Sequence, residues 1–129
     1  MYNSIWYHNL IQPALTPPAW VFSVAWTILY LLMAISFVIF LRTKSKYDKI
    51  QGAVMFFTQL ALNFCWSPAF FYFKSPEFAL VIILFLDIAV LLTIIEFFKV
   101  SKYSAGILVP YFLWIIFATY LNIGYVVLN

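Results

Sequence analysis

Residues 20–41 read WVFSVAWTILYLLMAISFVIFL and contain no charged side chain. A helix of about 20 apolar residues crosses the hydrocarbon core of a bilayer, which is about 30 Å thick. Three further stretches of similar length and apolar character follow, at 52–73, 77–98 and 105–127, and of these only 77–98 contains charged side chains. Alternation with a period of two, as in a β-barrel, is absent, and open strands cannot satisfy their backbone in lipid. The sequence therefore predicts an all-α membrane bundle with four transmembrane helices.

The composition agrees with this assignment. Of the 129 residues, 67% are hydrophobic and 9% are charged. A water-soluble domain averages about half apolar and about a quarter charged residues. Too little polar surface remains to coat a globule in water. Because no internal repeat or domain boundary interrupts the pattern, we predict a single transmembrane domain over residues 1–129.

The basic residues predict how the bundle is oriented. Six of the seven Lys and Arg lie in the segments 42–50 and 99–104, and Lys74 lies between the second and third spans. Alternation of the spans puts the two basic segments on one side, which the positive-inside rule makes cytoplasmic. Such clusters report topology and do not form a phosphate-binding face, so no nucleic-acid partner is predicted. The expected location is a bacterial-type inner membrane.

Side chains for common catalytic or metal chemistry are scarce. His8 is the only histidine and Cys65 the only cysteine, which excludes a multi-His metal centre and an intrachain disulfide within one chain. We predict no metal site and no required cofactor; for His8, an interfacial polar role and an axial haem ligand are the alternatives. Asp87 lies in mid-span, where an ionisable residue is a functional hypothesis. It is alternatively a protonated acid or the partner of an Asn or Tyr on another helix.

The segment ALNFCWSPAFF at 61–71 raises the question of why an apolar span contains an asparagine and a tryptophan. Trp26, Trp66 and Trp114 all lie well inside spans, where an indole N–H needs a polar partner or a ligand. Helical spacing groups each with neighbours on one face. These groups are Trp26 with Tyr30, Trp66 with Asn63 and Phe70, and Trp114 with Ala118 and Asn122. Helix packing with Asn as an interhelical bond, and a pocket for a flat, mostly apolar ligand, both fit this pattern.

Three motifs in the same order resemble the TspO/MBR family of tryptophan-rich sensory and translocator proteins. They are TPPAWVFSVAWTILYLLMA at 16–34, LALNFCWSPAFFYF at 60–73 and ILVPYFLWIIFATYLN at 107–122. The segment WYHNLIQPALTPP at 6–18 is similar to a loop that serves as the pocket lid in that family, within a predicted loop over 1–19. It differs at Gln12 and Leu15, where the family usually has Lys and Trp.

The resemblance implies a pocket for porphyrins such as protoporphyrin IX or haem, and for sterol-like molecules in some members. Carried over by motif, the ligand-binding residues are Trp26, Tyr30, Asn63, Trp66, Phe70, Trp114 and Ala118. Some bacterial members degrade protoporphyrin IX in light, and for that reaction the resemblance implies Trp26 and Trp114 as the catalytic pair. A transporter, or a regulatory partner without tight ligand binding, is the alternative. The resemblance also implies a homodimer.

The family bundle has five transmembrane helices, and the first of them precedes the lid loop. This sequence begins at that loop. The resemblance therefore implies a four-helix version of the bundle, with the missing helix belonging between the spans at 20–41 and 52–73. We expect the pocket to open sideways to lipid there, or to be closed by another chain.

Overall fold

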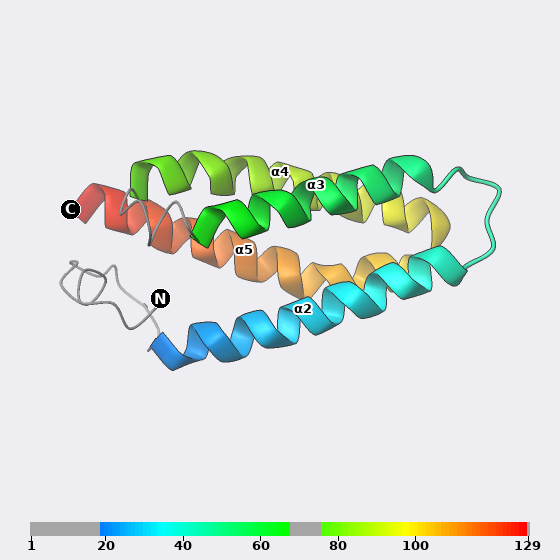
Figure 1. Cartoon of the computed structure of the whole chain (residues 1–129), viewed down its shortest axis with the longest axis horizontal. Coiled ribbons are helices and arrows are strands. Elements are labelled where there is room, and N and C mark those ends of the chain that lie inside the picture. The colour runs from blue at the N-terminus through cyan, green and yellow to red at the C-terminus, as the bar shows by residue number, and fades with distance from the viewer. Residues whose placement is uncertain (1–18, 68–75, 129) are drawn as a thin grey trace.

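A computed structural model describes residues 19–67 and 76–128, which form four α-helices. They are α2 (Ala19–Arg42), α3 (Ile50–Ser67), α4 (Pro76–Val100) and α5 (Lys102–Leu128). The helices alternate in direction and lie along one long axis (Figure 1). No strand occurs in these two ranges, so the all-α prediction is confirmed for them.

Three of these helices, α2, α4 and α5, are long and apolar enough to cross a membrane. Helix α3 does not reach that standard over its 18 described residues, because Gln51, Gln59 and Asn63 reduce its hydropathy. The predicted span 52–73 continues beyond Ser67 into residues outside the described ranges. The fourth crossing therefore stays a prediction.

The connection between α4 and α5 is shorter than predicted. Ser101 alone separates the two helices, where the sequence predicts a link over 99–104. The Ser101 hydroxyl accepts a hydrogen bond from the Ser104 backbone N–H at 3.3 Å, and its carbonyl accepts one from Ala105 N–H at 3.2 Å. Ser101 is thus a helix N-cap, and its capping lets α5 begin one residue after the chain turns. The other basic connection, between Arg42 and Ile50, agrees with the predicted loop.

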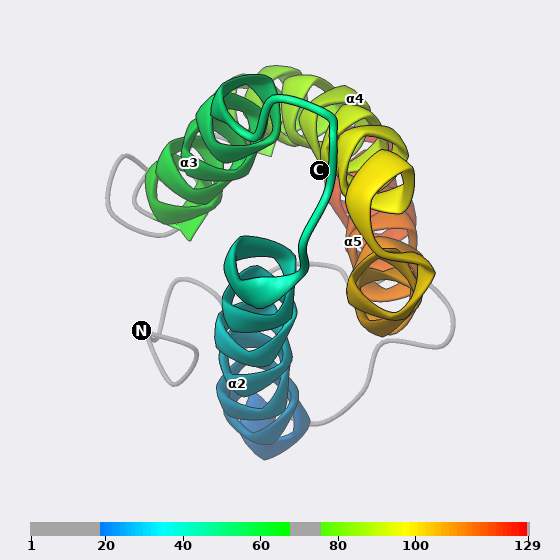
Figure 2. The ribbon, with the colours of Figure 1, turned by 90° about the vertical axis from the view of Figure 1, so that its right-hand side faces the viewer.

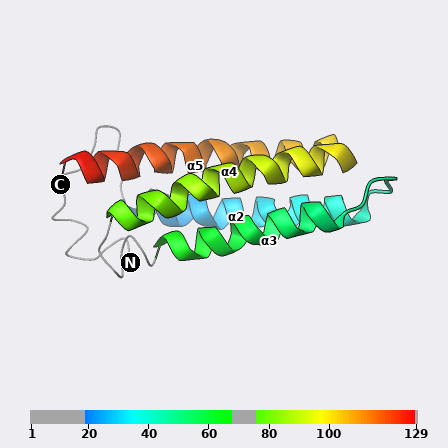
Figure 3. The ribbon, with the colours of Figure 1, turned by 90° about the horizontal axis from the view of Figure 1, so that it is seen from above.

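The four helices form an arc in the order α3, α4, α5, α2 when viewed along the bundle (Figure 2). Helix α4 packs against both α3 and α5, and α5 packs against α2. Helices α2 and α3 stand at the two ends of the arc and meet through long side chains, such as Phe37 stacked on Phe56 at 4.5 Å between ring centroids. Both basic connections lie at one end of the bundle (Figures 1 and 3), as the alternation of the spans predicts.

Phenylalanine rings fill the interior at the end with the basic connections. Phe40 of α2 is 1% exposed and stacks on Phe97 of α4 with 4.1 Å between ring centroids. A Cβ atom added to Gly52 of α3 would lie 2.6 Å from Cζ of Phe40. The glycine therefore lets the α3 backbone approach the ring of Phe40 closely.

Gly52→Ala should lower the free energy of unfolding by about 1–3 kcal/mol, because the buried Phe40 ring cannot retreat without disturbing Phe97. The measurement is denaturant unfolding in detergent micelles. Gly106→Ala is the matched control, since no heavy atom lies within 4 Å of a Cβ added there. It should leave stability unchanged or raise it by about 0.5–1 kcal/mol. Equal effects of the two substitutions would contradict the close approach at Gly52.

Candidate functional site

The half of the bundle away from the basic connections contains an aromatic compartment, which we define as Phe22, Trp26, Tyr30, Trp66 and Trp114. Trp66 is 7% exposed, and the indole nitrogens of Trp26 and Trp114 are buried although their rings are only half-buried. The ring centroids of Trp26 and Trp66 are 6.4 Å apart, and Phe22 meets Trp114 edge-on at 6.0 Å. Indoles from three helices therefore turn toward the interior of the bundle.

The helical period explains why these side chains meet. Residues three or four apart lie on one face of a helix, and Phe22, Trp26 and Tyr30 follow one another at intervals of four on α2. Ala118 lies four residues after Trp114 on α5 and is 3% exposed. Its small side chain takes up little of the space on the compartment face of α5.

Hydrogen bonds link three helices beside the compartment through what we call the polar chain. The Tyr30 hydroxyl donates to Oδ1 of Asn63. Asn63 Nδ2 donates to the Tyr111 hydroxyl, and this hydroxyl donates to Oε1 of Gln59, both at 2.7 Å. Gln59 Nε2 ends the chain 3.6 Å from the sulfur of Met33. Asn63 of α3 thus connects α2 to α5, which supports the interpretation that its side chain forms hydrogen bonds between helices.

The indole N–H groups fall into two kinds. Trp66 Nε1 donates to Oδ1 of Asn122 at 2.9 Å, joining α3 to α5. The Nε1 atoms of Trp26 and Trp114 are buried and have no hydrogen-bond partner among the described residues. An indole nitrogen only donates, so these two groups call for an acceptor. The compartment can therefore offer a ligand two N–H donors and several aromatic faces.

Of the seven residues predicted for the site, Trp26, Tyr30, Asn63 and Trp66 are joined by ring contacts and a hydrogen bond. Trp114 contacts Phe22, and the buried Ala118 lies one turn after Trp114 on α5. Phe70 and the predicted lid over 1–18 lie outside the described residues. Sequence reasoning missed Gln59 and Tyr111 as members of the polar chain. The position of Gln59, one helical turn before Asn63 in an apolar span, is a signal that could have found it.

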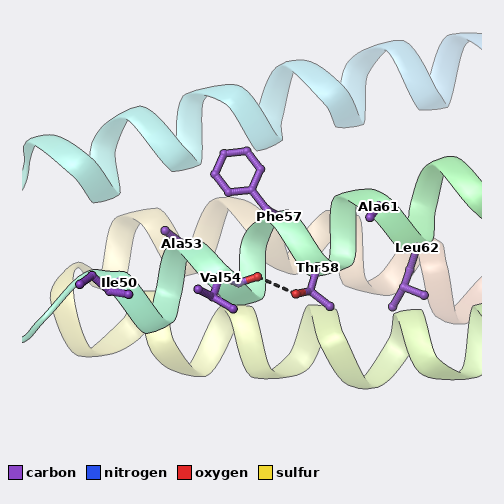
Figure 4. Close-up of a pocket in the computed structure, with 7 residues that line it drawn as sticks. All are labelled: Ile50, Ala53, Val54, Phe57, Thr58, Ala61 and Leu62. Carbon is purple, nitrogen blue, oxygen red and sulfur yellow. Dashed lines mark hydrogen bonds between the residues drawn. The ribbon is translucent and has the colours of Figure 1, made fainter.

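A separate hollow lies on the outer face of α3 (Figure 4). It has a volume of about 710 Å³ and is lined by Ile50, Ala53, Val54, Phe57, Thr58, Ala61 and Leu62. Its one hydroxyl, on Thr58, already donates to the Val54 carbonyl at 2.7 Å. In a bilayer, acyl chains are as apolar as these side chains and cover such a face without a specific ligand. We therefore place the candidate site in the aromatic compartment.

This chain is similar to known proteins over almost its whole length. The family model described as "TspO/MBR family" matches residues 1–128. The tryptophan-rich protein TspO of Chlorobaculum tepidum is 41% identical over 126 residues, covering 96% of this chain and 80% of that protein. The protein of the same name from Archaeoglobus fulgidus is 43% identical over 125 residues with the same coverage. The human translocator protein is 34% identical over 119 residues, covering 91% of this chain and 70% of its own length.

Asn63→Leu should lower the free energy of unfolding by about 1–2 kcal/mol, because it removes the acceptor of Tyr30 and the donor to Tyr111 in an apolar interior. Unfolding in detergent micelles measures the loss. Cys65→Ala is the control on the same helix, since the Cys65 side chain is exposed. Stability of Asn63→Leu equal to that of Cys65→Ala would show that the polar chain does not hold the helices together.

Proposed function

This chain belongs to the TspO/MBR family, and on that premise we propose that it binds a tetrapyrrole, such as protoporphyrin IX or haem, in the aromatic compartment. The carrying observation is the pair of buried indole N–H groups of Trp26 and Trp114, which have no partner among the described residues. A porphyrin offers flat faces that stack on indoles and carboxylates that accept their hydrogen bonds. A sterol-like ligand, with one hydroxyl, satisfies fewer of these groups.

Ligand entry requires the aromatic side chains to separate. A flat ring held between two indoles needs about 7 Å between them, twice the contact distance of about 3.5 Å. The rings of Trp26 and Trp66 are tilted by 40° with 6.4 Å between centroids, so they contact each other. Helices α2 and α3 form the two ends of the arc and contact each other through side chains, such as Phe37 on Phe56 and Tyr30 on Asn63. We propose that the ligand enters between these two helices.

We also propose that the protein works as a homodimer in a bacterial-type inner membrane. As a separate part of this proposal, the segments 42–50 and 99–104 face the cytoplasm. The support for this orientation is the position of six of the seven Lys and Arg in these two segments, which lie at one end of the bundle (Figure 1). Basic residues next to membrane spans favour the cytoplasmic side.

Titration of the purified protein with protoporphyrin IX should quench tryptophan fluorescence saturably. Trp26→Phe and Trp114→Phe should each raise the dissociation constant for protoporphyrin IX by about tenfold, since each removes an N–H donor and part of a stacking surface. Trp20→Phe is the control, because Trp20 is 67% exposed and should leave the dissociation constant unchanged. Quenching that never saturates would exclude the binding function and favour a transporter or regulatory partner that does not hold its ligand tightly.

Light-dependent degradation of protoporphyrin IX is a second candidate function, favoured by the position of two indoles, Trp26 and Trp114, in one compartment. An indole next to a bound porphyrin can exchange an electron with its excited state, and oxygen is the oxidant. Illumination of the porphyrin-loaded protein in air should then bleach the porphyrin bands faster than illumination of free porphyrin. Trp26→Phe with Trp114→Phe should remove that acceleration at saturating porphyrin. Bleaching at an unchanged rate would leave binding as the function.

A further inference from the structure

We propose that Asp87 is a proton-binding site: it holds a proton at neutral pH and through it donates a hydrogen bond to the Thr119 hydroxyl. This hydrogen bond joins α4 to α5 inside the membrane. Asp87 lies roughly midway along the 25-residue helix α4. A charged carboxylate is costly at that depth, and such residues are neutral or paired with a partner in the bundle. Three observations on the described residues favour the neutral form.

The first observation is a count of hydrogen atoms around Thr119. Its hydroxyl oxygen lies 2.8 Å from Oδ2 of Asp87 and 2.9 Å from the carbonyl oxygen of Ile115. A hydroxyl has one hydrogen to donate, and a backbone carbonyl only accepts. When Thr119 donates to Ile115, one turn earlier on the same helix, the contact with Asp87 takes its hydrogen from the carboxyl group. An ionised Asp87 would instead make two acceptors compete for one hydrogen.

The second observation concerns the other carboxyl oxygen. Oδ1 of Asp87 is buried and has no hydrogen-bond partner among the described residues. An ionised carboxylate spreads its charge over both oxygens, and burying one of them without a donor is strongly unfavourable. In a protonated acid Oδ1 is an uncharged carbonyl oxygen, for which the same environment is much less unfavourable.

The third observation is the lack of a cation beside Asp87. Helix α4 packs against α3 and α5. The one Lys, Arg or His in these two helices is Lys102, the first residue of α5 at the end of the bundle with the basic connections, and the sequence has none over residues 50–67 or 103–128. The titratable side chains of those two helices over these ranges are Cys65, Tyr103, Tyr111, Tyr120 and Tyr125, and none of them is a cation. Glu96, by contrast, pairs with Lys99 at 3.1 Å near the end of α4.

The proton acts next to the aromatic compartment. Thr119 follows Ala118 directly, and Asn122, one turn later on α5, accepts the indole hydrogen of Trp66. Loss of the proton removes the hydrogen bond between α4 and α5 at this position and leaves a charge in the apolar interior. Asp87 thus sets the packing of the helix that provides Trp114 and Ala118.

Infrared difference spectra of the full chain in lipid nanodiscs, wild type minus Asp87→Asn, test the proposal. At neutral pH we expect the C=O stretching band of a protonated carboxylic acid. Thr119→Val should shift this band to higher frequency, because the acceptor of its hydrogen bond is gone. Thr93→Val is the matched control and should leave the band in place, since the buried Thr93 hydroxyl donates only within α4, to the Ala89 carbonyl at 2.7 Å.

A carboxylate band at neutral pH in place of the acid band would overturn the proposal, as would an acid band that Thr119→Val leaves unmoved. The assignment does not depend on the folding of Asp87→Asn. Asp48 and Asp87 are the only aspartates in the sequence, so aspartate labelled with ¹³C at its carboxyl carbon reports on both in the wild-type chain. Asp48, in the exposed connection, gives the carboxylate band and Asp87 the acid band.

Discussion

The structure depends on one constraint, which is that polar side chains inside an apolar bundle must bond to one another because lipid offers no partner. The polar chain meets this constraint in one direction, from Tyr30 through Asn63 and Tyr111 to Gln59. Each hydroxyl donates its single hydrogen to the next acceptor, and the sulfur of Met33 takes the last contact. The polar chain fixes α2, α3 and α5 relative to one another, because apolar packing alone would allow each helix many rotations about its own axis.

This constraint also decides which groups remain for a ligand. Tyr30 and Asn63 form hydrogen bonds with residues of other helices, and Trp66 donates its indole hydrogen to Asn122. The N–H groups of Trp26 and Trp114 in the same compartment have no hydrogen-bond partner within residues 19–67 and 76–128. The bonded residues hold the walls in position, and the unbonded indoles are the groups that a flat ligand with acceptor atoms would meet.

Apolar length and the positions of Lys and Arg were sufficient to predict the all-α bundle and the end that carries the basic segments. Trp26, Trp66 and Trp114 were predictable as interior residues because an indole in mid-span has few other places for its N–H. Tyr111 was missed because a tyrosine among nine, in a chain rich in aromatics, gives no signal of its own. Its partners come from residues 48 and 52 positions away, and only the packing of α3 near α5 brings them together.

The connection at Ser101 shows a different limit of the sequence. The lysines at 99 and 102 led to the prediction of a loop, but Lys99 lies in the last turn of α4 and Lys102 is the first residue of α5. The Ser101 N-cap lets the chain turn within one residue. Asp87 was recognisable as unusual from its depth alone. Its partner Thr119 was not, because a threonine that bonds to its own helix one turn earlier is common in membrane spans.

The most direct test of the account is the ¹H–¹⁵N spectrum of the tryptophan indoles in lipid nanodiscs, recorded as protoporphyrin IX is added. The account predicts the largest shifts for the indole signals of Trp26 and Trp114, a smaller one for Trp66, whose hydrogen Asn122 already accepts, and none for the exposed Trp20. Shifts confined to Trp20, or equal shifts of the signals of Trp20, Trp26, Trp66 and Trp114, would show that the porphyrin does not enter the compartment.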